Sequence, residues 1–290
     1  MVQHTTFGVG GPADLFFLPA DAEDLASTLE LIKEADVPVL PVGGGTNMLV
    51  KDAGFRGVVI CLTDGMTDIS FDQDGARVEA GASTQVFSRR CQREGRSGMA
   101  FGCGIPGTVG GAIRGNAGAW GGETFDDLVW IRGIDLNSAH EMTLKKSEVG
   151  HDYRRSDLAK DFLVLEAAFE LGEKDPVEIQ AEMDQMLAER KASQPVWQRN
   201  AGCVFKNPDG SSAGLLIDRT GCKGMSVGNV SVSDVHANFM VIDTGAGNGG
   251  VTAADILKLI ERVRTHVHDR EGVNLETEVR IVGEFGIENV

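Results

Sequence analysis

The sequence has few of the features that mark secreted, membrane-bound or metal-binding proteins. Its five cysteines are an odd number, lie far apart and include no Cys-x-x-Cys pair, which argues against both a disulfide framework and a zinc site. No apolar run approaches the length that spans a bilayer, and the first residues lack the basic and apolar segments of a signal peptide. We therefore expect a cytoplasmic protein with reduced thiols and no metal ion.

Positive charge is also scarce. Lys and Arg number 27 against 43 Asp and Glu, which gives a net charge of −16, and no run of Lys or Arg occurs. A protein that grips nucleic acid through its phosphates usually presents a basic face, so nucleic acid is not an expected partner. The acidic balance does not exclude an anionic small molecule, because a few local donors suffice to hold a phosphate.

Glycine is what the chain has in excess, with 38 residues among 290. Glycine without a collagen period is typical of tight turns and of places where the backbone approaches a ligand closely. The chain is also longer than a typical single domain. From the order of the expected elements we divide it into residues 1–65, 66–175 and 176–290.

Hydrophobic spacing predicts a fold that mixes helices and strands. The expected helices span residues 21–35, 84–93, 176–193, 213–220 and 253–270. The expected strands span residues 37–42, 58–62, 76–82, 129–135, 162–171, 236–243 and 276–285. Thr252 and Asp255 resemble a capping box at the start of the last helix.

Many of the glycines gather in two loops. GGGTN at residues 43–47 follows a buried strand, and the successive N–H groups of such a turn can form a nest that binds phosphate without a lysine. GIPGTVGGA at residues 104–112, with Asn116 close behind, is a second glycine cradle, which Pro106 stiffens. Two cradles suit a ligand with a pyrophosphate and a long body. The alternative interpretation is two loops with a purely structural purpose.

Seven motifs along the chain resemble the UDP-N-acetylenolpyruvoylglucosamine reductase, or MurB, family. In order they are HTTFGVGGPAD, PVGGGTNMLV, GIPGTVGGAIRGNAGA, YRRS, NAGCVFKNP, HANFMV and LETEVRIVG, and they extend over nearly the whole chain. The resemblance implies an α+β fold with an FAD-binding part of the vanillyl-alcohol-oxidase (PCMH) type, made of two N-terminal subdomains, and a C-terminal α+β domain for the substrate. The chain lacks a tyrosine-bearing insertion found in one branch of the family, so it is similar to the shorter branch.

The resemblance also implies the activity, that of a flavin-dependent oxidoreductase (UDP-N-acetylmuramate dehydrogenase). NADPH would reduce FAD, and UDP-N-acetylglucosamine enolpyruvate would then be reduced to UDP-N-acetylmuramate for peptidoglycan synthesis, and hence for cell-wall biogenesis, cell shape and cell division. The expected partners are these small molecules, with no nucleic acid and no membrane, and a monomer is favoured. The implied FAD contacts are Gly43, Gly44, Gly45, Thr46, Asn47, Gly104, Ile105, Pro106, Gly107, Gly110, Gly111, Ala112 and Asn116.

Reduction of an enolpyruvyl ether sets the chemical demands on the site. A hydride delivered to the methylene carbon builds negative charge on the adjacent carbon and its carboxylate, so a cation is needed there. Arg154 suits this role, because a guanidinium can hold a carboxylate through two bonds, and the resemblance favours it over Arg155. Glu278 matches the family's catalytic glutamate, although strand alternation would put Glu276 on the same face.

Cys203 is the unusual position. The family's proton donor at this place is a serine, and here the loop has a cysteine. An acid must protonate the carbon opposite the flavin, and a thiol with a reference pKa of about 8.5 can do so. We therefore expect Cys203→Ser to stay active and Cys203→Ala to lose flavin reoxidation by the substrate. The alternative is a buried structural cysteine, with the acid supplied elsewhere.

The resemblance implies four substrate contacts. Lys191 aligns with a lysine that binds the substrate diphosphate, although by composition alone it would be a surface lysine at a helix end. Asn207 and Asn238 match further contacts, and Tyr153, the only tyrosine of the chain, is expected to line the same pocket.

Two other functions stay open at this point. The first is an oxidoreductase of the same FAD fold that acts on a different substrate, against which Lys191, Asn207 and Asn238 argue. The second is a non-catalytic nucleotide-binding module in which Cys203 marks lost activity. The presence of both Arg154 and Glu278 argues against that module.

Overall fold

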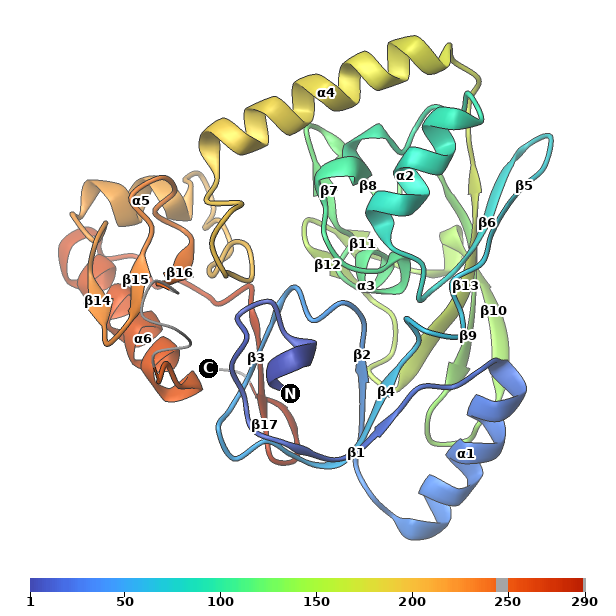
Figure 1. The fold of residues 1–290 in the computed structure, drawn as a ribbon, viewed down its shortest axis with the longest axis horizontal. Helices are drawn as coiled ribbons and strands as arrows, with labels where there is room; N and C mark the ends of the chain where they lie inside the picture. The colour runs from blue at the N-terminus through green and yellow to red at the C-terminus, as the bar shows by residue number, and fades with distance from the viewer. Residues whose placement is uncertain (244–249, 289–290) are drawn as a thin grey trace. The chain divides into compact units, whose positions relative to one another are not determined.

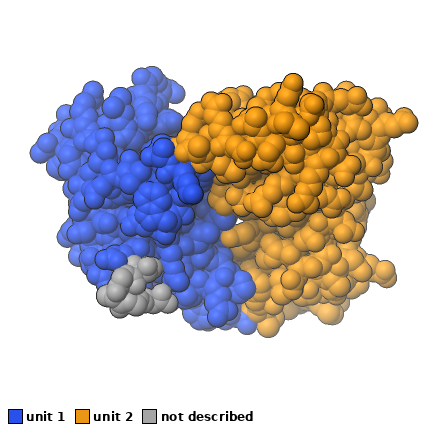
Figure 2. Space-filling view, turned by 45° about the horizontal axis from the view of Figure 1, so that its top comes forward, with its two compact units in different colours: residues 1–14, 45–57, 190–290 blue, residues 15–44, 58–189 orange. Residues whose placement is uncertain are grey.

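A computed structural model describes residues 1–243 and 250–288 (Figure 1). The chain forms two compact units, which Figure 2 draws in blue and orange. Unit 1 comprises residues 1–14, 45–57 and 190–290, and unit 2 comprises residues 15–44 and 58–189. The three-part division at residues 65 and 175 stays a prediction.

Unit 2 is built on an antiparallel five-stranded sheet in the order β10-β9-β13-β6-β5. Its strands are β5 (Ile69–Phe71), β6 (Gly75–Glu79), β9 (Leu128–Asp135), β10 (Glu141–Lys145) and β13 (Phe162–Glu170). The central strand β13 starts with four buried apolar residues, Phe162 to Leu165, as expected of a strand covered on both faces. Its pairing with β9 shifts register between Val164 and Glu166, at a bulge.

All residues of unit 2 are described, and it contains four α-helices and two short 3₁₀ helices. They are α1 (Ala22–Ala35), α2 (Thr84–Arg93), η2 (Ala100–Gly104), α3 (Val109–Arg114), η3 (Lys146–Glu148) and α4 (Pro176–Ser193), of which α4 belongs to unit 2 up to Glu189. In α1 the Asp21 side chain accepts from the Asp24 N–H, and Leu25, Leu29 and Ile32 are buried on one face. This face packs into the core of unit 2.

Shorter strands complete unit 2. They are β2 (Val39–Val42), which runs parallel to β4 (Phe55–Cys61), and the hairpins β7 (Gly118–Ala119) with β8 (Gly122–Glu123) and β11 (His151–Asp152) with β12 (Arg155–Ser156). The third strand of the β4 sheet is β1 (Ala13–Phe17). Both β1 and β4 begin in unit 1 and end in unit 2, so the chain passes between the units within these strands.

Unit 1 has its own apolar core, centred on its long helix. Its elements are η1 (Val2–His4), β3 (Met48–Val50), α5 (Ala213–Arg219), β14 (Ser226–Val227), β15 (Val230–Val232), β16 (Met240–Ile242), α6 (Ala253–Glu271), β17 (Arg280–Gly283) and β18 (Gly286–Glu288). The capping box of Thr252 and Asp255 is confirmed at the start of α6. Both carboxylate oxygens of Asp52 also accept from N–H groups there, those of Ala253 (2.8 Å) and Ala254 (3.0 Å).

Two expected strands have less than half of their predicted length. Of residues 236–243 only Met240–Ile242 form a strand, because the preceding residues make a turn around Ser233 and His236. Of residues 276–285 only Arg280–Gly283 belong to β17. Glu276 and Glu278 both precede the strand, so the prediction that strand alternation puts them on the same face was wrong.

The mixture of helices and strands matches the predicted α+β class. Over residues 1–243 and 250–288, no helix combines the length and the apolarity needed to cross a membrane. In the same part of the chain, no group of three or more His, Cys, Asp or Glu side chains is arranged to hold a metal ion.

Candidate active site

The two glycine loops meet in unit 2 at Gly43 and Thr108. Gly43 directly follows β2, and a Cβ added to it would overlap the hydroxyl oxygen of Thr108. The thiol of Cys61 donates to the carbonyl of Gly43 at 3.8 Å. Gly44, the next residue, is exposed. The close contact of residue 43 with the Thr108 side chain therefore favours glycine, and the predicted contact of these residues with FAD stays a prediction.

The second half of the GGGTN loop lies in unit 1. Gly45 has φ +61°, and a Cβ there would overlap the carbonyl oxygen of His4, so only glycine fits. Asn47 links the loop to the chain before β17, because its side-chain amide donates to the Glu278 carbonyl (3.3 Å) and its own carbonyl accepts from the Arg280 N–H (3.1 Å). Thr46, between them, is half-buried.

The second glycine loop contains a helix that sequence reasoning missed. Residues 109–114 form α3, whose N-cap Thr108 accepts from the Gly111 N–H at 3.3 Å. A Cβ on Gly110 would lie 2.8 Å from that of Ala80, so this glycine lets the helix pack against the chain after β6. Protein acceptors take the N–H groups of Val109, Gly110, Gly111 and Ala112. Gly110, Gly111 and Ala112 thus provide close packing, and their contact with FAD stays a prediction.

Thr84, the first residue of α2, lies against the start of this loop and has a buried hydroxyl without a partner in the described residues. Gly104 ends η2, the Ile105 N–H donates to Gly102, and Gly107 has φ +113°. The carbonyl of Gly107 accepts from the N–H of Thr84 at 3.1 Å. Within the described residues, the buried Thr84 hydroxyl has no hydrogen-bond partner.

The Thr84 hydroxyl fits a bound polar group at these loops. An unpaired buried hydroxyl is costly unless a ligand or water completes it, whereas Gly43 lets the first loop pack on Thr108 of the second. The residues present therefore fit FAD. Sequence reasoning missed Thr84, because one threonine at the start of a helix resembles an ordinary structural residue.

Asn116 is buried, with φ +39°, and its side chain is engaged by protein. Its amide nitrogen donates to the Glu123 carboxylate (2.7 Å) and to the Asp152 carbonyl (3.1 Å), and its oxygen accepts from the Phe125 N–H (3.2 Å). Asn116 therefore joins the β7–β8 hairpin to the end of β11. Its predicted contact with FAD stays a prediction.

Arg154 lies at the tip of the β11–β12 hairpin in a strained backbone conformation. Its φ is +56°, which is uncommon for a residue with a side chain and is often found at functional sites. Its guanidinium donates to the Gly118 carbonyl (3.0 Å) and lies over the Tyr153 ring, 4.9 Å from the ring centre. Arg155 is exposed and pairs with Asp157 at 3.2 Å. Arg154 is thus oriented by protein contacts, whereas Arg155 is exposed, and the catalytic role of Arg154 stays a prediction.

Cys203 differs from the other cysteines of the chain. Cys61, Cys91, Cys103 and Cys222 are buried, whereas Cys203 is partly exposed. Burial raises the pKa of the Cys91 thiol well above its ordinary value, as expected of a structural cysteine. The partial exposure of Cys203 does not fit the alternative of a buried structural cysteine.

The segment that carries Cys203 is held on one side by Asn238. The Asn238 side chain accepts from the Phe205 N–H (2.9 Å) and donates to the Phe205 carbonyl (2.8 Å). Its backbone carbonyl accepts from the Val204 N–H (2.9 Å), and Cys203 forms a β-bridge with Phe239. Asn238 is itself buried, so it positions the thiol segment, and its predicted contact with the substrate stays a prediction.

Glu278 lies on the other side of the same segment. Its N–H donates to the Val204 carbonyl at 2.8 Å, and the neighbouring Thr277 forms a β-bridge with Phe205. Glu276, which sequence spacing could not distinguish from Glu278, has an exposed side chain that pairs with Lys206 at 3.3 Å. Unit 1 thus brings Cys203, Glu278 and Asn238 together on three adjacent segments.

The two remaining predicted residues of unit 1 lie at helix ends. The side-chain oxygen of Asn207 accepts from the N–H of Ala213, the first residue of α5, at 3.0 Å. Lys191 lies exposed in the last turn of α4. Three residues further on, the side-chain oxygen of Gln194 is buried and has no hydrogen-bond partner in the described part of the chain. Their predicted contacts with the substrate stay predictions.

Relatives of known family match the chain almost from end to end. A UDP-N-acetylenolpyruvoylglucosamine reductase of Geobacter metallireducens is 43% identical over 288 residues, which cover 98% of this chain and 92% of the relative. The protein of the same name from Heliobacterium modesticaldum is 41% identical over 288 residues, covering 99% of this chain and 90% of the relative.

Family models and a solved structure agree with these relatives. Residues 13–139 match an FAD binding domain, and residues 194–282 match the C-terminal domain of UDP-N-acetylenolpyruvoylglucosamine reductase. The crystal structure of this reductase from Thermus caldophilus superposes with a TM-score of 0.82 at 33% identity, covering 97% of this chain and 96% of that chain. The predicted FAD-binding α+β fold is confirmed. The chain belongs to the UDP-N-acetylenolpyruvoylglucosamine reductase family.

Proposed function

We propose that this protein reduces UDP-N-acetylglucosamine enolpyruvate to UDP-N-acetylmuramate, with NADPH as the electron donor, in the cytoplasmic synthesis of peptidoglycan precursors. Family membership supports the reaction, and the FAD binding domain supports the cofactor. One observation carries the assignment of the chemistry. Cys203 has the only partly exposed thiol among the five cysteines. The segment that carries it is joined to the segment of Glu278 by a backbone hydrogen bond.

The residues that would hold FAD are those of the two glycine loops, together with Thr84. Gly43 lets the first loop pack against Thr108 of the second, and the Thr84 hydroxyl is available to a polar atom. When bound, FAD supplies the hydride that the methylene carbon of the enolpyruvyl group receives. Every other requirement of the reaction falls on side chains of this chain.

Arg154 binds the substrate carboxylate and stabilises the negative charge that develops there. Its guanidinium is already oriented by the Gly118 carbonyl and the Tyr153 ring, so little reorganisation accompanies the reaction. The strained backbone at this residue is consistent with a role that fixes its direction. Tyr153 and Lys191 would add contacts to the sugar nucleotide, and Asn207 would add one beside α5.

Cys203 supplies the proton. As the methylene carbon gains a hydride, the adjacent carbon gains a proton from the thiol, so one S–H bond breaks and one C–H bond forms. The resulting thiolate then recovers its proton from solvent, to which Cys203 is partly exposed. Glu278, on the neighbouring segment, assists by polarising the substrate or by helping to deliver the proton.

Consumption of NADPH by the purified yellow protein, with and without UDP-N-acetylglucosamine enolpyruvate, tests the proposal. We expect sustained consumption only when the sugar nucleotide is present, with UDP-N-acetylmuramate as the product. A bound flavin that NADPH reduces, but that the sugar nucleotide does not reoxidise, would contradict the proposed function and leave the fold assignment intact.

A further inference from the structure

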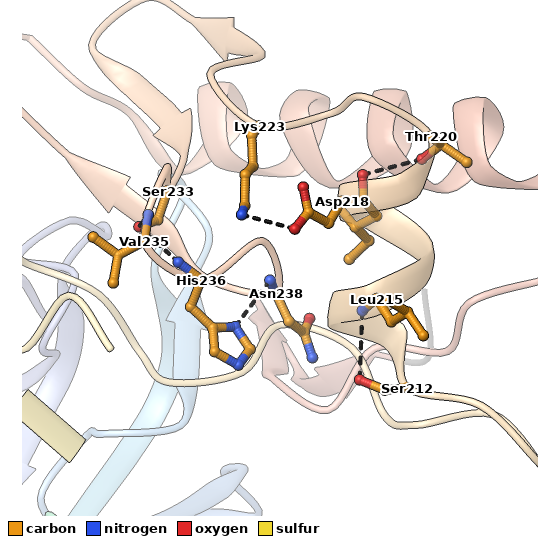
Figure 3. A network of polar contacts seen from close by, with 10 residues as sticks. Ser212, Leu215, Asp218, Thr220, Lys223, Ser233, Val235, His236 and Asn238 are labelled. Carbon is orange, nitrogen blue, oxygen red and sulfur yellow. Dashed lines mark hydrogen bonds and ion pairs between the residues drawn. The ribbon is translucent and has the colours of Figure 1, made fainter. Parts of the chain in front are cut away.

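His236 lies in the turn just before Asn238, the residue that holds the Cys203 segment (Figure 3). The ring nitrogen Nδ1 of His236 accepts from the backbone N–H of Asn238 at 3.2 Å. The start of the same turn is fixed by the Ser233 hydroxyl, which accepts from the N–H groups of Val235 (3.1 Å) and His236 (3.4 Å). Since Nδ1 is an acceptor, the neutral ring carries its proton on Nε2.

The His236 side chain is half-buried, and its ring is packed on two sides. It lies edge-on to Phe239, with the ring centres 4.9 Å apart. On another side it faces α5, where a Cβ added to Gly214 would lie 3.1 Å from the ring carbon Cε1. A larger residue at 214 would push the ring, so glycine at this position keeps the Nδ1 acceptor in place.

Hydrogen bonds and ring packing connect the His236 ring to the segment that carries the Cys203 thiol. The N–H of Asn238 is fixed by His236, and the carbonyl and side chain of Asn238 fix Val204 and Phe205. The next residue of the turn, Phe239, forms the β-bridge with Cys203 and packs on the His236 ring. The ring therefore supports both contacts that position the Cys203 segment on this side.

The surroundings of the ring oppose a positive charge on it. Burial lowers the pKa of His236 below its ordinary value; a backbone hydrogen bond of His236 offsets part of this shift, and the nearby positive charge of Lys223 adds to it. Lys223 comes from the turn after α5 and is paired with Asp218 of α5 at 2.8 Å. Asp234 lies two residues before His236 in the same turn, and Lys206, on the Cys203 segment, is ion-paired with Glu276.

We propose that neutral His236 is a positioning residue, which holds Asn238 and thereby the Cys203 thiol in the geometry for proton transfer. This inference rests on the proposed function of Cys203. Protonation of Nδ1 replaces its acceptor lone pair with a donor that faces the N–H of Asn238, so the turn must rearrange. The thiol segment then loses its support on this side.

The direction of the pH effect follows from the neutral form being the active one. Because the folded protein has the lower pKa, the ring stays neutral down to a pH below the ordinary value of 6.5. Substrate-dependent reoxidation of the flavin should therefore hold down to about pH 6.5 and fall as the pH drops through the lowered pKa of His236. The unfolded chain binds the proton more tightly, so the folded state also loses stability in this window.

Two variants distinguish the role of His236 as a hydrogen-bond acceptor from the effect of its protonation. In His236→Asn the side-chain oxygen can take the place of Nδ1 but does not titrate, whereas His236→Leu keeps the bulk and removes the acceptor. We expect His236→Asn to be reoxidised by the sugar nucleotide at close to the wild-type rate at pH 8, without the fall attributed to His236 at acidic pH. We expect His236→Leu to be slower by about 10²-fold at every pH, because the thiol is misplaced.

The half-reactions distinguish positioning from general damage to the fold. Reduction of the flavin by NADPH should be unchanged in both variants, and kcat of the substrate step should change more than KM. Reoxidation of His236→Leu at the wild-type rate would overturn the proposal. So would an acidic fall in His236→Asn identical to that of the wild type.

Nitrogen NMR of the His236 ring in the holoenzyme gives a test that does not depend on activity. We expect unprotonated Nδ1 and protonated Nε2 at pH 7.5, and ring protonation at a pH below 6.5. A proton on Nδ1 at pH 7.5 would overturn the role of His236 alone. Failure of the wild-type flavin to be reoxidised by the sugar nucleotide would instead overturn the proposed function.

Discussion

The two units hold their functional residues in different ways. In unit 2 the conformation of the predicted cofactor loops depends on glycines, which have no side chain. A Cβ at residue 43 would overlap Thr108, and Gly110 lets α3 pack on Ala80. In unit 1 the predicted catalytic residues depend on side chains that bind backbone, as Asn238 does with Phe205. Cofactor binding needs close approach of the backbone, whereas proton transfer needs one side chain held in one direction.

This difference predicts that substitutions in the two units impair different steps of the reaction. Changes in the glycine loops of unit 2 should weaken FAD binding, and changes around Cys203 in unit 1 should slow only the step that consumes the substrate. Arg154 is the informative exception, because it belongs to unit 2 and is proposed to act on the substrate.

Arg154→Ala should have the largest effect of the unit 2 variants. Loss of the guanidinium removes charge stabilisation at the carboxylate, so we expect reoxidation of the flavin by the sugar nucleotide to slow by about 10²- to 10³-fold. FAD content and reduction by NADPH should not change. Arg155→Ala is the matched control, because its side chain is exposed and pairs with Asp157. Equal losses in both variants, measured by stopped-flow absorbance, would contradict the assignment.

Gly43→Ala should separate the cofactor loops from the catalytic segment. The added Cβ would overlap the Thr108 hydroxyl, and relief of such a clash typically costs about 1–3 kcal/mol. We expect FAD affinity, measured by quenching of flavin fluorescence, to fall by about tenfold or more. At Gly115 the first atom that a Cβ meets is 3.6 Å away, so Gly115→Ala serves as the control. Unchanged affinity in Gly43→Ala would show that the loop does not determine FAD binding.

Asp52→Ala should have the smallest effect, on stability alone. Removal of the carboxylate leaves the N–H groups of Ala253 and Ala254 without their acceptor, so we expect unit 1 to lose about 1 kcal/mol. Urea unfolding followed by circular dichroism measures this loss, and Asp64→Ala, which removes an exposed carboxylate of unit 2, is the control. A selective fall in the substrate step would contradict a purely structural role of Asp52.

Local sequence signals predicted the long helices well. Residues 84–93 and 176–193 form α2 and α4 as expected, and α1 begins after its predicted cap Asp21. The helices α1 and α2 combine buried apolar residues with a side-chain N-cap, and α4 begins with Pro176, which favours a helix start, so nearby residues determine the outcome. The roles of Arg154 and Glu278 stay predictions, and the choice between each of them and its neighbour came from the family resemblance.

Long-range packing accounts for what the sequence could not predict. Gly110 and Gly111 disfavour a helix, yet α3 forms because Gly110 allows it to lie against Ala80. Residues 236–239 have a strand-like pattern, yet they turn because Ser233 and His236 accept N–H groups within the turn. The different roles of Glu276 and Glu278 depend on their partners, Lys206 and Val204, which lie about 70 residues earlier in the chain.

The most direct test of the account is the rate at which UDP-N-acetylglucosamine enolpyruvate reoxidises NADPH-reduced Cys203→Ala and Cys203→Ser. We predict equal flavin reduction in both variants, substantial reoxidation in Cys203→Ser, and a loss of about 10²- to 10⁴-fold in Cys203→Ala. Reoxidation of Cys203→Ala at the wild-type rate would contradict the claim that this thiol supplies the proton.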